Sequence, residues 1–354
     1  MMHASLEAGA PREPSSRLNR KRRPPNSPDA PRFGPAIPNS SPWSSRSSAV
    51  AHTSNFFAID RGDVLLLDGR VYVIAGTARE RGFGLDDEPK HWVKSAIDGD
   101  TGEPKIIKLV FQEQFTQRLG GCTVRCFRSP AKEARVLERV RGHPHFMTGF
   151  AVRDAAGNDV RIIDVIGGPS LDDVVTGQPG THEAYFHQRV PALLGRLLPC
   201  LDALRFLNEA GERHGDVRAD HVIVDRRSGL FRWIDFDYDF THPEAPFSLD
   251  ILGVGKILAL IVGKGVVDAH RLERDPGLTG VLARLCADDL SIVDRAWVMN
   301  LGKVYPYIPV ALNHVLRHFS SGAEIFYETV GQLLEDLGDA MTRLVKEDAK
   351  EIGP

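Results

Sequence analysis

The sequence has few cysteines, no long apolar run and little net charge. Its 354 residues include only four cysteines, at irregular spacing, which excludes a disulfide scaffold and predicts a reducing, cytoplasmic environment. The longest apolar run, residues 251–262, is interrupted by Lys256 and predicts a buried helix rather than a membrane span. The formal net charge of −3 gives no overall attraction for nucleic acid. We therefore expect neither a membrane nor a nucleic acid as the main partner.

Residues 1–54 differ in composition from the rest of the chain. Pro, Ser and Arg dominate, and residues 17–23 read RLNRKRR. Such a composition buries too little apolar surface to offset the entropy lost on ordering, so we predict a disordered tail. The basic cluster leaves open an arm for nucleic acid or an acidic partner, beside the simpler prediction of a solvated tail.

Short apolar segments separated by Asp-Gly turns begin near residue 56. Residues 64–67, 71–74 and 106–111 predict β-strands, and Asp68-Gly69 predicts a hairpin between the first two. Residues 76–84 read GTARERGFG. Glycines allow backbone N–H groups to approach phosphates closely, although a plain surface hairpin fits the same residues equally well.

Lys108 lies within the apolar strand pattern of residues 106–111, where an unpaired ammonium group would be costly to bury. A helix is predicted at residues 130–140, with the stop signal Gly-His-Pro after it. Its carboxylates Glu133 and Glu138 are competing partners for the lysine. The alternative is a lysine that extends from a strand edge into solvent.

Two acidic motifs flank a predicted hairpin. Residues 214–221 read HGDVRADH and residues 235–237 read DFD, on either side of two short apolar segments joined by a polar turn. Such a hairpin would hold Asp216 and Asp235 close together. One carboxylate can then accept a proton while the other holds a metal on nucleotide phosphates. The alternative is that both are ordinary turn residues.

The remaining segments predict helices. Leucines at helical spacing in residues 190–210 predict a buried helix, and residues 307–316 and 326–337 predict amphipathic helices. Asp250, directly before the apolar run at 251–262, is a good N-cap for that helix.

The motifs in this order resemble the protein-kinase-like superfamily. The pattern H-R-D-x-K-x-x-N matches residues 214–221, and D-F-G matches residues 235–237; the glycine after His214 and the final acid of DFD also resemble aminoglycoside and choline kinases. The resemblance covers about residues 56–337. It implies an α+β, bilobal protein-kinase-like fold, with a small antiparallel β-sheet and one helix at about 55–165, a mainly helical lobe at about 166–340, and tails at 1–54 and 341–354.

The resemblance also implies roles for individual residues. Asp216 would accept the proton of the acceptor hydroxyl, and Arg218 would neutralise charge on the transferred γ-phosphoryl group. Asp250 would hold the backbone of the 214–221 loop. The nucleotide and its metal would be held by a larger set: Lys108 and Glu133 at the α- and β-phosphates, Gly82 and Gly84 over the phosphates, Val165 and Ile166 at the adenine, and Asp235, His221 and Asp237 at the metal.

The function implied is ATP- and magnesium-dependent phosphoryl transfer to a hydroxyl group, with protein Ser/Thr favoured as acceptor and a small molecule as the alternative. His221 departs from the pattern, because an asparagine metal ligand is usual at this position. Imidazole suits magnesium less well than an oxygen ligand does, which brings manganese into consideration. The same departure leaves open a pseudokinase, a nucleotide-binding or scaffolding module without turnover.

Overall fold

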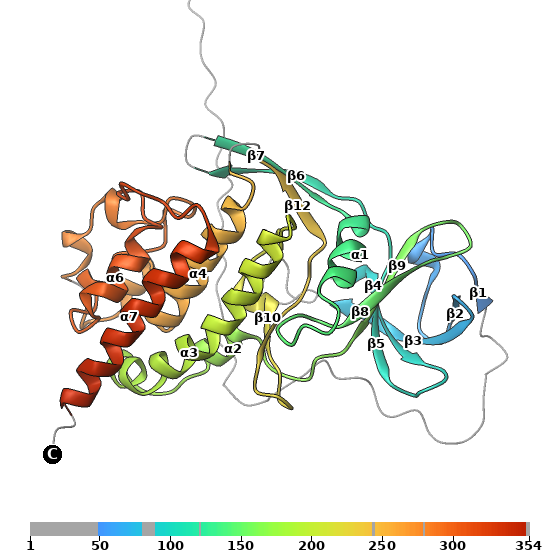
Figure 1. Cartoon of the computed structure of the whole chain (residues 1–354), viewed down its shortest axis with the longest axis horizontal. Helices are drawn as coiled ribbons and strands as arrows, with labels where there is room; N and C mark the ends of the chain where they lie inside the picture. Colours follow the sequence, from blue (N-terminus) through green and yellow to red (C-terminus); the bar gives the residue numbers. More distant parts are fainter. Residues whose placement is uncertain (1–48, 80–88, 120–121, 243–244, 279, 352–354) are drawn as a thin grey trace, which may run out of the picture.

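The computed structural model describes residues 49–79, 89–119, 122–242, 245–278 and 280–351. The fold is mixed α+β: Figure 1 shows a curled β-sheet with helix α1 on the right and a group of packed helices on the left. Gly82, Gly84 and the predicted tail as far as residue 48 lie outside the described residues.

Within the described residues, seven strands form one sheet in the order β1-β2-β3-β4-β5-β9-β8. The strands are β1 (Ala49–Val50), β2 (Val64–Leu67), β3 (Arg70–Arg79), β4 (Pro89–Asp98), β5 (Pro104–Lys108), β8 (Gly149–Arg153) and β9 (Asp159–Asp164). The predicted strands are confirmed, although β5 ends at Lys108 rather than at residue 111. Asp68 (φ 50°) and Gly69 (φ 74°) make the predicted β2–β3 turn, since two consecutive positive φ angles match the strand twist.

Residues 49–54 were predicted to belong to the tail, but they make ordered contacts with the fold. Strand β1 pairs in parallel with β2, and Thr53 is buried. The Thr53 hydroxyl donates to Asp154 at 2.8 Å. These contacts compensate for the conformational entropy that the segment loses on ordering. The composition of the segment does not reveal them.

Helix α1 (Pro130–Arg139) packs against β8 and β9. Its start follows from local chemistry, because the side chain of Ser129 accepts a hydrogen bond from the backbone N–H of Lys132 and Pro130 occupies the first turn. Val136 and Leu137 point into the core. The helix predicted at 130–140 is confirmed.

A second, three-stranded sheet has no counterpart in the sequence prediction. Strands β6 (Gln114–Leu119) and β7 (Cys122–Arg128) form a hairpin between β5 and α1. The distant strand β12 (Tyr238–Thr241) pairs with β7 in antiparallel fashion, with Tyr238 opposite Arg128. Figure 1 shows this sheet along the top of the molecule. It ties the segment after the DFD motif to the region before α1.

The helical part is formed by α2 (Leu171–Thr176), α3 (His182–Glu209), α4 (Ser248–Gly263), α5 (Ala269–Arg274), α6 (Val310–Arg317) and α7 (Val330–Glu351). The predicted helices at 190–210, 251–262, 307–316 and 326–337 correspond to α3, α4, α6 and α7. The domain boundary predicted after residue 340 falls within α7, whose buried Leu337, Ala340 and Met341 continue one apolar face.

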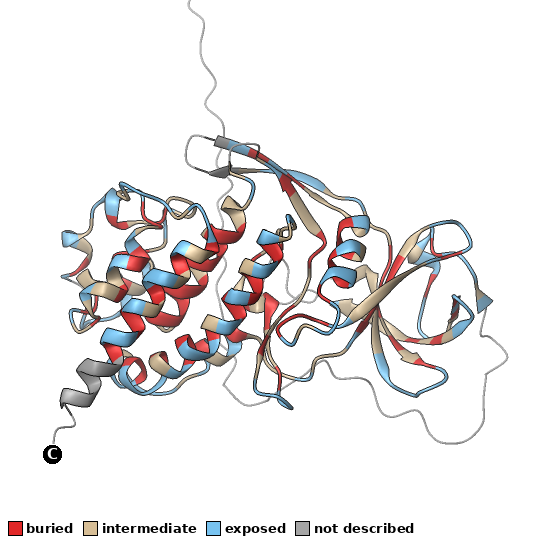
Figure 2. Ribbon diagram, viewed as in Figure 1, coloured by how far each residue is buried: buried red, intermediate tan, exposed pale blue. Residues whose placement is uncertain are grey.

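Two larger buried clusters divide the core, one within the seven-stranded sheet and one among the helices. Figure 2 shows the buried faces of α3, α4 and α7 turned toward one another. Short 3₁₀ turns connect the elements: Phe56–Ala58, Ala219–His221, Leu282–Arg284, Ala287–Asp289 and Leu301–Lys303. None of the helices in the described part combines the length and apolarity needed to cross a bilayer.

The predicted hairpin between the acidic motifs is confirmed. Strands β10 (Val222–Val224) and β11 (Phe231–Trp233) pair in antiparallel fashion, with Val222 opposite Trp233. The 214–221 loop therefore enters the hairpin beside the point where the DFD motif leaves it.

Candidate functional site

The loop at residues 214–221 is held in place by α4. Both carboxylate oxygens of the buried Asp250 accept backbone hydrogen bonds, from the N–H groups of His214 and Gly215, each at 2.8 Å. This confirms the loop-holding role expected for Asp250. The N-cap role is wrong, because the residue at the N-cap of α4 is Phe247.

Gly215 allows this loop to approach β12 closely. Its φ is +87°, and a Cβ atom built at this position would lie 1.8 Å from the carbonyl oxygen of Tyr238. A larger residue would suffer both backbone strain and a clash with a backbone atom that cannot turn aside. The glycine of the HGD motif is therefore a requirement of packing between two loops.

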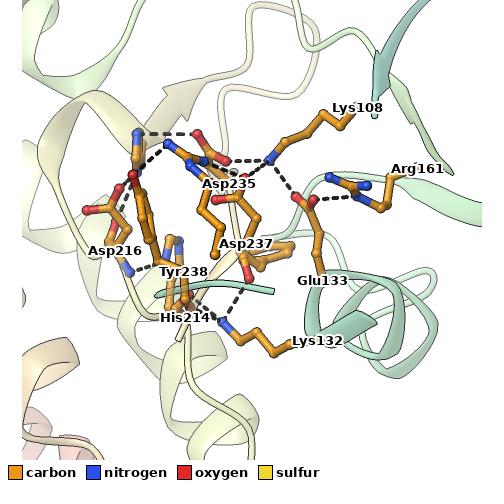
Figure 3. Close-up of polar contacts among 12 residues, drawn as sticks. Lys108, Lys132, Glu133, Arg161, His214, Asp216, Asp235, Asp237 and Tyr238 are labelled. Atoms are coloured by element: carbon orange, nitrogen blue, oxygen red, sulfur yellow. Dashed lines mark hydrogen bonds and ion pairs between the residues drawn. The ribbon is translucent and has the colours of Figure 1, made fainter. Parts of the chain in front are cut away.

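Lys108 lies at the centre of a buried charge cluster (Figure 3). Its ammonium nitrogen is 2.8 Å from Glu133, 2.5 Å from Asp235 and 3.1 Å from Asp237. Burial alone would lower the pKa of Lys108, but the attraction of these carboxylates outweighs it and raises that pKa. Burial would likewise raise the pKa of Asp235, yet Lys108 holds it well below its usual range. Both groups therefore carry their charge.

The structure decides between the two candidate partners of Lys108. Glu133 is fully buried and also accepts a hydrogen bond from Arg161 at 3.0 Å. Glu138 is exposed and pairs with Arg141 instead. Lys108 itself is only 5% exposed, so the alternative of a lysine extended into solvent is wrong.

Asp216 lies beside two basic groups. Its carboxylate is 3.4 Å from Nδ1 of His221 and 3.8 Å from the Arg218 guanidinium. Burial raises the pKa of Asp216, against the opposing pull of His221 and Arg218, which strengthens it as a proton acceptor. Arg218 is held in this position by Asp220, to which its Nε donates at 2.9 Å.

The imidazole of His221 lies between Asp216 and Asp235. Its Nδ1 is 2.9 Å from the backbone oxygen of Asp216, and because a carbonyl can only accept, Nδ1 is the donor. The other ring nitrogen, Nε2, lies 3.6 Å from the Asp235 carboxylate. His221 and Asp235 are therefore close enough for one bound cation to contact both.

Asp237 offers a second sign of a cation site. One of its oxygens binds Arg128 at 2.6 Å and Lys108 at 3.1 Å, while the other is buried without a hydrogen-bond partner among the described residues. In that part of the chain no three acidic, His or Cys side chains form a metal-binding group by themselves. The unpartnered carboxylate oxygen is of the kind that magnesium takes from a protein, which commonly supplies one or two carboxylates while phosphates and water complete the coordination.

Three basic residues of the site were not predicted from the sequence: Arg128, Lys132 and Arg161. Arg161 lies opposite Lys108 in the β5–β9 pairing and shares Glu133 with it. A second charged residue in an apolar strand was a usable signal for Arg161. Arg128 and Lys132 gave none, because their partners Asp237 and Phe236 lie more than a hundred residues further along the chain.

Val165 and Ile166 lie in the segment between β9 and α2 and are half-buried. The same segment contacts the β10–β11 hairpin, because the backbone N–H of Arg226 donates a hydrogen bond of 2.9 Å to the Gly167 oxygen. Their predicted contact with adenine stays a prediction.

Comparisons with known proteins add little to this geometry. No protein-family model matches the chain, and no curated protein matches it. Among solved structures, a crystal structure of Rad53 1–466 in complex with AMP-PNP aligns at 14% identity and a TM-score of 0.40, over 69% of this chain and 60% of that one. The alignment thus spans less than two thirds of the Rad53 chain. A similarity at this level carries no argument about function.

Proposed function

We propose that the chain is an ATP-dependent phosphotransferase with a bilobal, protein-kinase-like fold. The observation that carries this proposal is the continuous polar cluster from Lys108 through Asp235 and His221 to Asp216. It unites a cation suited to phosphates, a charged carboxylate suited to a metal, and a carboxylate with a raised pKa suited to accept a proton.

Each residue has a defined task in this proposal. The oxygen of the acceptor hydroxyl attacks the γ-phosphorus, and the bond between the γ-phosphorus and the β-phosphate oxygen breaks. Asp216 accepts the proton that the hydroxyl loses. Arg218 neutralises charge on the transferred group, and Lys108, oriented by Glu133, binds the α- and β-phosphates.

The remaining nucleotide contacts come from the other predicted residues. Gly82 and Gly84 would cover the phosphates, and the backbone at Val165 and Ile166 would bind adenine. Asp235 would hold the magnesium ion, and His221 and Asp237 would be its further ligands. When bound, the metal neutralises charge on the phosphates.

A serine or threonine hydroxyl of a protein is the acceptor that we favour. A small-molecule acceptor is supported by one observation: the carbonyls of Tyr238 and Phe240 on β12 are already occupied by Lys132 and Arg213, at 2.7 and 2.8 Å. A peptide that added to this edge as a further strand would have to share or displace these hydrogen bonds. The non-catalytic alternative, a nucleotide-binding module, is supported by His221 in place of the metal-ligating asparagine.

The proposal is tested by incubating the purified chain with magnesium and γ-labelled ATP, with the chain itself, mixed proteins or small hydroxyl compounds as acceptors. We expect label to enter one acceptor class, and α-labelled ATP, as the control for non-covalent binding, to leave none. Nucleotide binding without transfer in magnesium or in manganese would favour the non-catalytic alternative.

The metal preference should depend on His221. We expect manganese to support a higher rate than magnesium in the parent, because a nitrogen ligand suits manganese better. His221→Asn restores an oxygen ligand and should narrow that difference. The rate in both metals is the measurement, with His270→Asn, on the exposed surface of α5, as the matched control. An unchanged ratio in His221→Asn would show that His221 does not bind the metal.

A further inference from the structure

Lys132 is a buried cation without a role in the phosphoryl transfer described above. It lies in the first turn of α1 and is only 1% exposed. In the part of the chain that the structure describes, it forms no ion pair; its nitrogen donates only to backbone oxygens. A lysine buried in this way costs desolvation energy that no partner carboxylate in direct contact offsets, which calls for another reason for its presence.

The three hydrogens of the Lys132 ammonium group are all used, and on two different loops. The nitrogen lies 2.7 Å from the oxygen of His214, 2.8 Å from that of Phe236 and 2.7 Å from that of Tyr238. An ammonium group has three donors, so its hydrogen-bonding capacity is saturated. Figure 3 shows the side chain reaching from α1 to the point where the two loops meet.

The charge state supports this arrangement. Burial lowers the pKa of Lys132 to about 8, while Asp250, Asp239, Asp237 and Glu133 oppose the shift. At neutral pH the nitrogen therefore keeps its third hydrogen, and all three carbonyls receive a donor.

The two loops that Lys132 joins carry the two acidic residues of the site. His214 lies two residues before Asp216, and Phe236 directly follows Asp235. The N-cap of α1 adds a further link, because the backbone N–H of Ser129 donates to the oxygen of Asp237 at 2.6 Å. The start of α1 is thus the common support of both loops.

The neighbouring residue Glu133 connects this support to the phosphate-binding cation. Consecutive residues in a helix point about 100° apart, so Glu133 faces the sheet and Lys108 while Lys132 faces the loops. One turn of α1 therefore contacts Lys108, the loop of Asp235 and the loop of Asp216.

We propose that Lys132 is a positioning residue, which fixes the distance between the loop of Asp216 and the loop of Asp235 through its three carbonyl contacts. The inference rests on the proposed phosphotransferase function. A misplacement of about 1 Å between reacting groups can lower a rate by about 100-fold, while the residues that bind nucleotide stay in place.

Lys132→Met tests this proposal, because it keeps an unbranched side chain only one heavy atom shorter and removes all three donors. We expect kcat to fall by about 100-fold, with little change in nucleotide affinity measured by equilibrium binding. The control is Arg135→Met. Arg135 lies on the exposed side of the same helix and pairs with Glu212, so its replacement should leave both kcat and nucleotide affinity near the parental values. A kcat within a few-fold of the parent, or equal losses of affinity and kcat, would overturn the proposal.

Lys132→Arg is a second variant that tests the proposal even if Lys132→Met does not fold. It keeps the charge, but a planar guanidinium group cannot donate to three carbonyls arranged around a single nitrogen. We expect a kcat between those of the parent and the Met variant, again with binding retained. A full parental kcat in Lys132→Arg would mean that charge alone suffices and would contradict the positioning role.

Hydrogen exchange separates this inference from the proposed function. If the parent transfers no phosphoryl group, the proposed function fails, and amide exchange at residues 214–218 and 235–239 then decides the inference. We expect faster exchange of both segments in Lys132→Met, or in Lys132→Arg if the first does not fold, and parental exchange in Arg135→Met. Unchanged protection of both segments would show that Lys132 does not hold them.

Discussion

Asp216→Asn is expected to abolish phosphoryl transfer and to leave nucleotide binding nearly intact, whereas Asp235→Asn should abolish transfer and also markedly weaken metal-dependent nucleotide binding. Asp216 lies on the side of His221 away from Lys108, and the proton-accepting role proposed for it acts on the transition state. Loss of a general base lowers a rate by about 10²–10⁴-fold. Asp235 contacts Lys108 directly, and the metal-binding role proposed for it already acts in the bound ground state.

Label transfer from γ-labelled ATP and metal-dependent nucleotide affinity, measured on the same preparations, check this expectation. Asp202→Asn, on the exposed surface of α3, serves as the control for a carboxylate-to-amide change. Full turnover in Asp216→Asn would show that the assignment of the HGD motif is wrong. Unaltered metal-dependent binding in Asp235→Asn would remove Asp235 from the metal site.

Glu133→Gln is expected to destabilise the fold as well as the site. Glu133 separates Lys108 from Arg161, two cations that lie opposite each other on adjacent strands. Without the negative charge of Glu133, the repulsion between the buried cations Lys108 and Arg161 is less well balanced by neighbouring carboxylates. Breaking a buried ion pair in this way typically costs about 3–5 kcal/mol, and we expect a decrease of that order in the free energy of unfolding.

Chemical denaturation of the parent, Glu133→Gln and Glu138→Gln measures the effect. Glu138 is the exposed carboxylate of the same helix, and its loss should cost less than about 1 kcal/mol, as for surface ion pairs. Similar costs for the two variants would mean that Glu133 is not the carboxylate that stabilises this cluster.

The parts of the site that depend on local pattern can be predicted from the sequence. A lysine in an apolar strand, an acidic motif on each side of a hairpin and a capped helix are each encoded within a few residues. For that reason Lys108, Asp216 and Asp235 can be named from the amino-acid sequence alone. Asp250 shows the limit of such patterns: the sequence fits an N-cap and a loop-holding residue equally, and only tertiary packing decides between them.

The parts of the site that the sequence does not predict depend on pairing across long distances. Arg128 meets Asp237 only because β12 pairs with β7, and no periodicity in residues 114–128 indicates that partner. Lys132 is similar, since an ammonium group in the first turn of a helix is ordinarily exposed. The composition of residues 1–54 predicts that Thr53 belongs to a tail. Composition carries no information about its buried hydrogen bond with the distant Asp154.

The β7–β12 pairing also bears on the order in which the chain folds. Arg128 and Tyr238 are 110 residues apart, so during synthesis the β6–β7 hairpin leaves the ribosome long before its third strand exists. Closing so large a loop carries an entropic cost that favours late formation. Without residues 235–241 in place, Lys108 and Arg161 share the single carboxylate of Glu133. Docking of this segment brings Asp235 and Asp237 to Lys108, so the charge cluster is complete only once this long-range pairing has formed.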